Sequence, residues 1–136
     1  MTAPMNWRLE LIPIPVADVD RAKQFYIEKV GFHLDHDVTT GPKFRVVQLT
    51  PVGSACSICI GRGIVSTPPG SVQGLHLVVS DIHAAHAQLV AAGVEASEVK
   101  EIAPGISFVF FKDPDGNGWA VQQIDPAVRR PPGDSR

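Results

Sequence analysis

The sequence has only two cysteines, no long apolar run and no strong excess of charge of either sign. Its 136 residues include 12 Lys and Arg against 14 Asp and Glu, which gives a formal net charge of −2. No basic cluster is present apart from Arg129 and Arg130, so nucleic acid is not expected as a partner. The apolar runs are far shorter than the ~18 residues that a membrane span needs, and the first residues do not follow a signal-peptide pattern. We therefore expect a cytoplasmic protein with no membrane partner.

The two cysteines, Cys56 and Cys59, form a C-x-x-C motif. A redox motif of this kind lies at a helix N-terminus, where the helix dipole lowers the thiol pKa. Here the surrounding segment ACSICIG predicts a strand, and no second pair of cysteines completes a zinc site. The motif is therefore interpreted as two structural thiols.

The composition is that of one folded domain spanning residues 1–136. Hydrophobic residues make up 44% of the chain and charged residues 19%, a balance too apolar for intrinsic disorder. A chain of this length buries roughly two thirds of the surface that its unfolded form exposes.

An internal repeat divides this domain into two halves. Residues 16–32 (VADVDRAKQFYIEKVGF) and 79–95 (VSDIHAAHAQLVAAGVE) both read as an Asp, an amphipathic helix and a Gly. The spacing predicts Asp18 and Asp81 as helix N-caps, and it predicts that the glycines end the helices. The offset of 63 residues also relates Gly53 to Gly116, which supports a true repeat.

Each half is predicted to contain a strand, a helix and three further strands. The runs after the helices are FHLDHDV, FRVVQLT and ACSICIG in the first half, and VEASEVKEI, ISFVFFK and WAVQQI in the second. The prolines at 13 and 15 favour an edge position for the first strand. We expect module 1 at about 7–61, a linker at 62–73, module 2 at 74–125 and a disordered tail at 126–136.

The segments PVADVDRAKQFYIEKVGF, FRVVQLTPVGSACSICIG, LVVSDIHAAHAQLVAAGV and FKDPDGNGWAVQQI resemble the vicinal oxygen chelate superfamily. This superfamily includes glyoxalase I, extradiol dioxygenases, fosfomycin-resistance enzymes and bleomycin-binding proteins. The resemblance implies an α+β fold in which two βαβββ modules form a curved mixed sheet around a central cavity. It also implies a homodimer.

The resemblance further implies a divalent metal held by a His or Glu from each of four strands. The corresponding positions here are Leu11, Ser57, Gly74 and Ala120, none of which is a metal ligand. We therefore expect a metal-free protein without a cofactor. A shift of two residues would place His76 at the second-half position, but one imidazole does not hold a metal.

His76 is the best placed histidine, because its strand parity matches that of Gly74 and points it into the cavity. It is either a structural histidine or a ligand donor and general acid/base near neutral pH. Asp35 is expected to face the cavity, whereas Trp119 is expected to pack away from it. Arg45 is a further candidate hydrogen-bonding residue, and the sequence pattern does not decide on which face of the sheet it lies. The predicted cavity is lined by Leu11, Gln48, Ser57, Gly74, His76, Ala120 and Gln122.

Two further motifs are interpreted as structural. The run from Asp113 to Gly118 resembles the start of a calcium loop, but the twelfth position is Ile124 and not a bidentate Glu. It is interpreted as a tight turn in which Asp and Asn tolerate unusual backbone angles. His83 and His86 lie three residues apart on a helix and are predicted to face solvent.

Three functions follow from these residues. The first is a binding protein, of a sequestering or resistance type, that takes a small organic molecule into its cavity and returns it unchanged. The second is a metal-independent isomerase, cyclase or lyase in which His76 is the base and Asp35 or Gln122 orients a carbonyl. The third is a metal-dependent glyoxalase or dioxygenase with displaced ligands.

Overall fold

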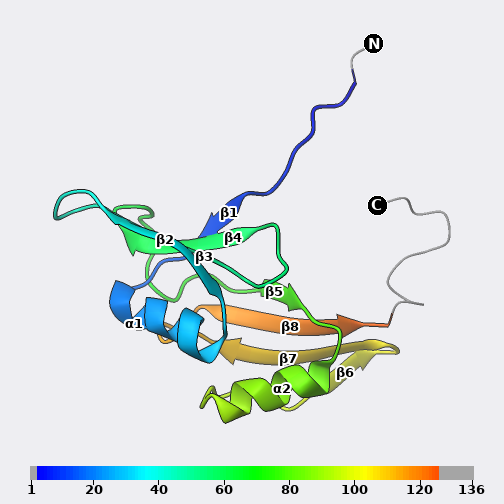
Figure 1. Cartoon of the computed structure of the whole chain (residues 1–136). Helices are drawn as coiled ribbons and strands as arrows, with labels where there is room; N and C mark the ends of the chain where they lie inside the picture. The colour runs from blue at the N-terminus through cyan, green and yellow to red at the C-terminus, as the bar shows by residue number, and fades with distance from the viewer. Residues whose placement is uncertain (1–2, 126–136) are drawn as a thin grey trace.

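The computed structural model describes residues 3–125 as two four-stranded sheets with helices on one side of each (Figure 1). The first sheet consists, in spatial order, of β1 (Leu11–Pro13), β4 (Ser57–Arg62), β3 (Arg45–Thr50) and β2 (His33–Thr39). The second consists of β5 (Leu75–Val78), β8 (Gly118–Ile124), β7 (Ile106–Lys112) and β6 (Lys100–Ala103). In each sheet the first strand runs parallel to the last strand of its half, and the other pairs are antiparallel. The predicted α+β fold is confirmed, while the tail 126–136 lies outside the described residues.

The helices begin and end where local sequence signals place them. α1 (Val19–Gln24) is capped by the Asp18 carboxylate, which accepts a hydrogen bond from Arg21 N at 3.0 Å. α2 (Ile82–Ala91) is capped in the same way by Asp81. Gly31 and Gly93 follow the helices with φ of 84° and 86°, the left-handed conformation in which glycine avoids a Cβ clash.

Two details differ from the sequence-based expectation, and a third agrees with it. The first helix widens into a π-helical turn, η1 (Phe25–Lys29), in which Val30 N donates to Phe25 O at 3.2 Å. The segment VEASEVKEI forms a strand only from Lys100 onward. At Ser97 the hydroxyl accepts the Phe110 N–H in place of a backbone carbonyl, while the Ser97 N–H donates to Phe110 O, both at 2.9 Å. The prediction for β1 is confirmed, since this proline-containing strand lies at the edge of its sheet.

The helix-covered sides of both sheets share one apolar core. Side chains from both halves are buried in it, with Tyr26, Ile14, Leu49, Ile60, Ile82, Val47 and Val109 among the largest fully buried apolar or aromatic ones. Trp119 was expected to pack away from the cavity. It is 4% exposed and stacks in this core on Phe111 with ring centroids 6.1 Å apart, but it also borders the small cavity that His76 lines. The halves therefore fold around common apolar contacts.

A buried polar network also joins the two halves. The Tyr26 hydroxyl donates to Asp113 Oδ2 at 2.8 Å and accepts from Trp119 Nε1 at 3.0 Å. Asn117 Nδ2 donates to the same carboxylate and to Pro15 O, at 2.8 and 2.9 Å. Burial, followed by the nearby Asp113 charge, raises the pKa of Tyr26 far above its ordinary value. The phenol therefore stays neutral in the folded protein.

The turn formed by residues 113–118 is held differently from the prediction. No Asp or Asn in the described residues adopts a positive φ, and Gly116 alone does so in this turn, with φ of 97°. The Asp113 Oδ1 atom instead accepts the N–H groups of Asp115 and Asn117, both at 2.9 Å. The acidic and amide side chains fix the turn by hydrogen bonding and leave the unusual backbone angle to glycine.

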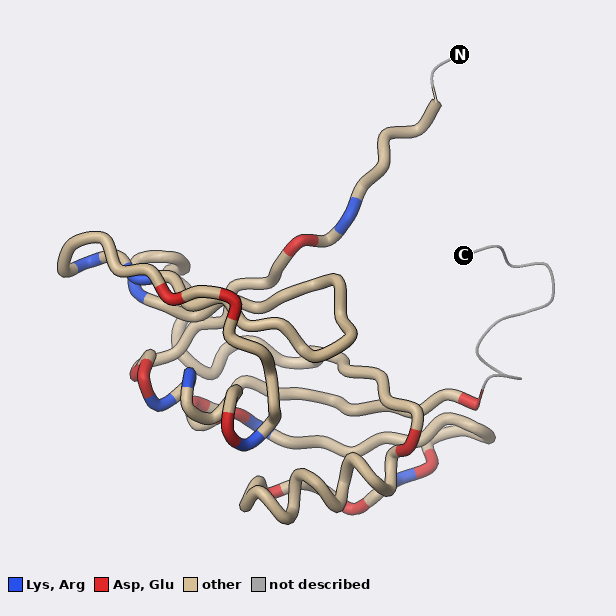
Figure 2. The backbone as a smooth tube through the Cα atoms, in the orientation of Figure 1, with Lys and Arg blue, Asp and Glu red and all other residues tan. Residues whose placement is uncertain are grey.

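An ion-pair cluster holds α1 against the first sheet. Arg45 donates from Nε and Nη2 to the Asp37 carboxylate at 3.0 and 2.7 Å, and Lys23 Nζ approaches the same carboxylate at 2.8 Å. Acidic and basic residues occur close together along α1 and the neighbouring strands (Figure 2). Hydrogen bonds from Arg45 and then Lys23 hold the pKa of Asp37 well below its usual range. Arg45 therefore lies on the helix-covered side of the sheet and not on the cavity side.

Candidate functional site

Each sheet has a second face that no helix covers. On the first sheet this face carries Leu11 directly opposite Ser57, with Gln48 opposite Cys59 one strand further. On the second sheet it carries His76 opposite Ala120 and Phe108 opposite Gln122. The alternation of side chains along a strand separates these residues from the core residues between them.

The strand register corrects one predicted position. His76, and not Gly74, lies opposite Ala120, as Leu11 lies opposite Ser57. The reason is the length of the connection, because four residues separate β1 from Asp18 whereas only two separate β5 from Asp81. Gly74 precedes β5 and stays beside the face, where it contributes a backbone carbonyl.

The uncovered face of the first sheet holds a hydrogen-bonded polar cluster around Asp35. A bulge in β2 between Leu34 and His36 turns the Asp35 side chain toward β3. There Thr50 Oγ1 and, at 3.3 Å, Gln48 Nε2 donate to Asp35 Oδ2. Since Thr50 has one proton, the contact of 2.6 Å between Thr50 Oγ1 and Ser57 Oγ must be donated by Ser57.

Asp35 is therefore a carboxylate that the sheet itself keeps ionised. Hydrogen bonds from Thr50 and then from His33, whose Nδ1 lies 3.0 Å from Oδ1, lower the pKa of Asp35. Its side chain remains 26% exposed. Such a group accepts hydrogen bonds from a ligand and favours positive charge.

The uncovered face of the second sheet is aromatic. The rings of Phe108 and Phe110 stack with centroids 5.7 Å apart and an interplanar angle of 5°. The His76 ring meets Phe108 edge-on at 5.9 Å and 89°. Phe110 remains 42% exposed, and Gln122 supplies an amide next to Phe108. This wall fits a flat apolar surface with one polar edge.

A hydrogen bond to the backbone determines which nitrogen of the neutral His76 ring carries the proton. Its Nδ1 lies 2.7 Å from the carbonyl oxygen of Gly74, and a carbonyl only accepts hydrogen bonds. In the neutral ring Nδ1 therefore carries the proton and Nε2 keeps its lone pair. The exposed imidazole is positioned to accept a proton or a hydrogen bond from a ligand.

His76 and Ser57 line one small cavity where the two sheets approach each other. This cavity measures about 200 Å³, and Gly74, Leu75 and Trp119 contribute to its wall. The structure thus brings His76, Ser57 and Gly74 together at this cavity. The other predicted residues are not part of its lining: Leu11, Asp35, Gln48, Ala120 and Gln122.

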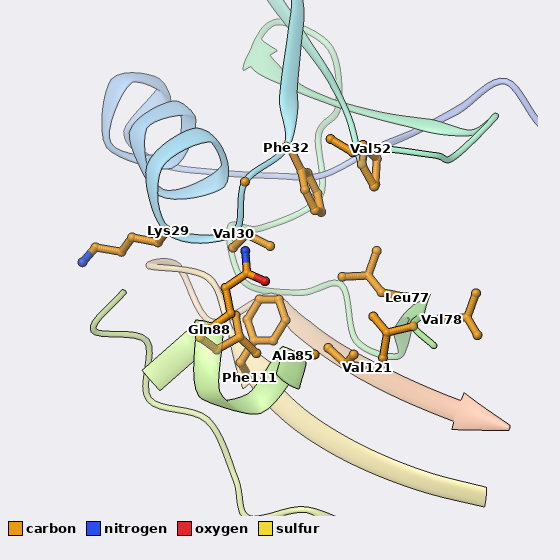
Figure 3. Close-up of a pocket in the computed structure, with 14 residues that line it drawn as sticks. Lys29, Val30, Phe32, Val52, Leu77, Val78, Ala85, Gln88, Phe111 and Val121 are labelled. Atoms are coloured by element: carbon orange, nitrogen blue, oxygen red, sulfur yellow. The ribbon is translucent and has the colours of Figure 1, made fainter. Parts of the chain in front are cut away.

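A second cavity on the helix side of the second sheet has no counterpart in the sequence analysis. It measures about 310 Å³ and lies between the end of η1, the β3–β4 turn and α2 (Figure 3). Val30, Phe32, Leu77 and Phe111 give it an apolar wall, and the Gln88 side chain lies between Val30 and Phe111 in the view of Figure 3. No sequence signal indicated it, because its walls meet only when the halves pack.

The two thiols and the two histidines of α2 are the remaining candidate residues. Cys56 and Cys59 are free thiols, and burial raises the pKa of Cys59, so this thiol is not a reactive thiolate. His83 is exposed and His86 is partly exposed on α2. No helix within residues 3–125 is long and apolar enough to cross a membrane.

The donor set at the four converging strand positions does not fit a divalent metal. After the register correction these positions hold Leu11, Ser57, His76 and Ala120, so a single imidazole is the only strong ligand among them. Elsewhere in residues 3–125, no three His, Cys, Asp or Glu side chains are arranged around a common point. No step of a mechanism is therefore assigned to a metal in this protein.

The fold and the paired sheet faces define a two-module α+β protein of the vicinal oxygen chelate type. A family model confirms this class: residues 8–121 match the Glyoxalase/Bleomycin resistance protein/Dioxygenase superfamily, and the chain belongs to that family.

This chain is similar to known proteins over almost their whole length, and two of them are solved structures. TnmS3, an antibiotic binding protein from Streptomyces sp. CB03234, is 34% identical and superposes with a TM-score of 0.81, covering 90% of this chain and 100% of its own. A glyoxalase/bleomycin resistance protein from the same organism is 36% identical, with a TM-score of 0.75 and coverages of 85% and 100%. The uncharacterized protein YetH of Bacillus subtilis (strain 168) is 28% identical over 114 residues, which are 82% of this chain and 94% of YetH.

Proposed function

We propose that this protein is a metal-free, homodimeric binding protein that sequesters a small organic molecule, as a resistance protein would. The observation that carries the proposal is the chemistry of the two uncovered faces, one aromatic and one centred on the Asp35 carboxylate. The similarity to TnmS3, described as an antibiotic binding protein, supports the same direction. The ligand that fits is flat and aromatic and carries a hydrogen-bond donor or a positive charge.

The exposure of these faces supports the proposed homodimer. Val78, Ile102 and Phe110 of the second sheet are 54%, 60% and 42% exposed, and Val38 of the first sheet is 49% exposed. Apolar side chains gathered on open sheet faces are typical of surfaces that a partner covers. A second copy would place its aromatic face against the polar face of the first, with the ligand between them.

Binding is tested with two flat probes of opposite charge, 9-aminoacridine and anthracene-2-carboxylate, by isothermal titration calorimetry. We expect the cationic probe to bind more tightly. Asp35→Asn should weaken its binding about tenfold or more, the effect of losing a hydrogen bond to a charged group. Glu95→Gln removes the same charge from a distant exposed position and should leave the affinity unchanged. Equal loss in both variants would contradict a role for Asp35.

A separate variant tests whether the ligand binds in the helix-side cavity. Gln88→Ala changes the polar group beside that cavity and leaves both sheet faces intact. Binding that depends on Gln88 and not on Asp35 would move the ligand site to the helix side of the second sheet.

Metal content is measured by inductively coupled plasma mass spectrometry after incubation with Zn²⁺, Ni²⁺, Mn²⁺ or Fe²⁺ and desalting. We expect far less than one metal per chain. Stoichiometric metal would contradict the proposal and make glyoxalase and dioxygenase substrates the next assays.

A metal-independent enzyme is the second candidate, and the free Nε2 atom of His76 favours it. In this role His76 is the general base, and Gln122 or Asp35 orients a carbonyl. Mass spectrometry of the bound compound after incubation distinguishes the two candidates, because a binding protein returns it unchanged. If product forms, His76→Ala should lower turnover by ~10² to 10⁴ while binding is largely retained.

A further inference from the structure

The helix-side cavity is an apolar space that the function proposed above does not use. Its volume of about 310 Å³ is roughly twice that of a cavity that holds one benzene molecule. Protein interiors are close-packed and contain few voids larger than a water molecule, so a space of this size is unusual. It is large enough for an apolar molecule of about ten carbon atoms.

Both halves of the chain supply the wall of this cavity. Val30 and Phe32 come from the segment between η1 and β2, whereas Leu77 and Phe111 come from strands of the second sheet. Phe32 and Phe111 are 5% and 3% exposed, so the core holds both rings in place. Val52 lies near Phe32 and is 85% exposed (Figure 3). A molecule bound in the cavity would cover part of this exposed apolar side chain.

The polar groups at the cavity favour a neutral molecule. No Asp, Glu or His side chain lies among the described residues that line it, and Lys29 is the charged one among them. The Lys29 ammonium donates to Ala92 O at 3.0 Å and points away from the other labelled side chains (Figure 3). The side-chain amide of Gln88 makes no hydrogen bond within residues 3–125 and lies beside the apolar wall (Figure 3). This amide is able to donate to a ligand or to accept from it.

We propose that the helix-side cavity is a second binding site, for a neutral and mostly apolar molecule of about ten carbon atoms with one hydroxyl, carbonyl or N–H group that meets Gln88. Pro51 and Leu77 line both this cavity and the small cavity beside His76, so the two spaces share part of a wall. Their ligands differ in charge, because the Asp35 carboxylate favours a positive group and the helix-side cavity does not. The inference does not depend on the function proposed above.

Methyl NMR spectra of the full-length protein show where a probe binds. Borneol is the probe, because it is a neutral bicyclic alcohol of the required size. Val30 and Val121 line the helix-side cavity and not the His76 cavity, whereas Ile12 and Ile58 line the His76 cavity and not the helix-side one. We expect borneol to shift the methyl signals of the two valines in a saturable manner and to leave those of the two isoleucines unchanged.

Two variants with matched controls measure the contributions of the wall and of the amide by calorimetry. Ala85→Leu enlarges a side chain of the wall and should weaken borneol binding at least ~tenfold, whereas Ala87→Leu makes the same change at an exposed position of α2 outside the lining and should have no effect. Gln88→Ala should weaken binding ~3- to 10-fold, the effect of losing one neutral hydrogen bond. Gln24→Ala removes an exposed amide outside the lining and should leave the affinity unchanged. Gln88 is exposed, so its variant keeps the test valid if Ala85→Leu does not fold.

The preference for a neutral molecule is tested with bornylamine, which has the same skeleton and carries an ammonium group. We expect it to shift the Val30 and Val121 signals with an affinity at least ~tenfold lower than that of borneol, because no carboxylate in the cavity offsets the lost hydration of the charge. Equal affinity for the two compounds would contradict the proposed ligand class.

The outcomes separate this inference from the function proposed above. Borneol that shifts the isoleucine signals instead of the valine signals, that binds Ala85→Leu as tightly as wild type, or that gives no saturable shift overturns the second site. The proposed function then still stands, because 9-aminoacridine binding is expected to depend on Asp35 and to be unchanged in Gln88→Ala. A protein that binds borneol at Val30 and Val121 but does not bind 9-aminoacridine would support the second site and contradict the proposed function.

Discussion

At the scale of single residues, the buried Tyr26 hydroxyl is both a hydrogen-bond donor and a hydrogen-bond acceptor. It donates to the buried Asp113 carboxylate and accepts from Trp119, so it serves two partners in the core. Two polar groups lose a partner when it is removed, and unmet polar groups in a core are costly.

We expect Tyr26→Phe to lower the free energy of unfolding by ~1–3 kcal/mol. The reason is that Asp113 loses a donor and the Trp119 N–H loses an acceptor at a site without solvent. Urea unfolding monitored by circular dichroism measures the change. Ser66→Ala, which removes an exposed hydroxyl from the segment between β4 and β5, is the control and should stay within ~0.5 kcal/mol. A similar small effect in Tyr26→Phe would show that the network contributes little.

The same residue predicts a pH dependence. The folded pKa of Tyr26 is raised, so its contribution to stability is complete below the ordinary value of about 10 and is lost as the pH rises above it. Tyr26 is the only tyrosine in the chain, so absorbance at 295 nm follows its ionisation alone. We expect no phenolate signal near pH 10 while the protein is folded, and a normal titration in urea. Titration near pH 10 with native circular dichroism would refute the burial of this hydroxyl.

At the scale of elements, the Asp37 carboxylate links α1 to the first sheet through Lys23, in addition to the apolar contacts of Val19 and Ala22. Asp37 accepts from both Arg45 and Lys23, and its side chain is 21% exposed. Its lowered pKa means that it stabilises the fold above pH ~4, and that this stabilisation is lost as the pH falls and the carboxylate becomes protonated.

We expect Asp37→Asn to lower the free energy of unfolding by ~1–3 kcal/mol at pH 7, with the difference from wild type shrinking below pH ~4. Urea unfolding at pH 7 and pH 3 checks both parts. Asp20→Asn is a matched control, because Asp20 pairs with the same Arg45 at 2.9 Å but its side chain is 82% exposed. The control should cost less than ~0.5 kcal/mol. Equal effects at the two positions would argue against a special role for Asp37.

The elements also explain which features the sequence could predict. The caps at Asp18 and Asp81 and the left-handed glycines depend on neighbouring residues, and all were predicted correctly. The second-half strand position was wrong because it depends on the length of a connection, which a repeat of 63 residues conceals. The bulge beside Asp35 likewise sets the direction of a side chain through pairing with β3, which no local pattern encodes.

Side-chain contacts between segments far apart in the sequence could not be predicted from the sequence. Tyr26 and Asp113 are 87 residues apart, and neither signals the other. The helix-side cavity exists only between packed halves. The roles of His76 and Asp35 stay predictions, since their chemistry depends on a ligand.

At the scale of the whole molecule, assembly should be visible in thermal stability. A dimer that buries the uncovered faces is stabilised by mass action, so its Tm rises with protein concentration. We expect an increase of a few degrees over a hundredfold concentration range by scanning fluorimetry. A wild-type Tm that is independent of concentration would count against the homodimer.

The difference between the two uncovered faces has a consequence for how a ligand is held. The repeat produced two sheets of equal topology, yet one face is aromatic and the other is polar. In a twofold dimer each binding space would have one wall of each kind, so the stoichiometry would be two molecules per dimer. Each molecule would have a defined head and tail, because only its donor-bearing end suits the carboxylate. Divergence between the halves would thereby give directionality to a site that an exact repeat would leave without it.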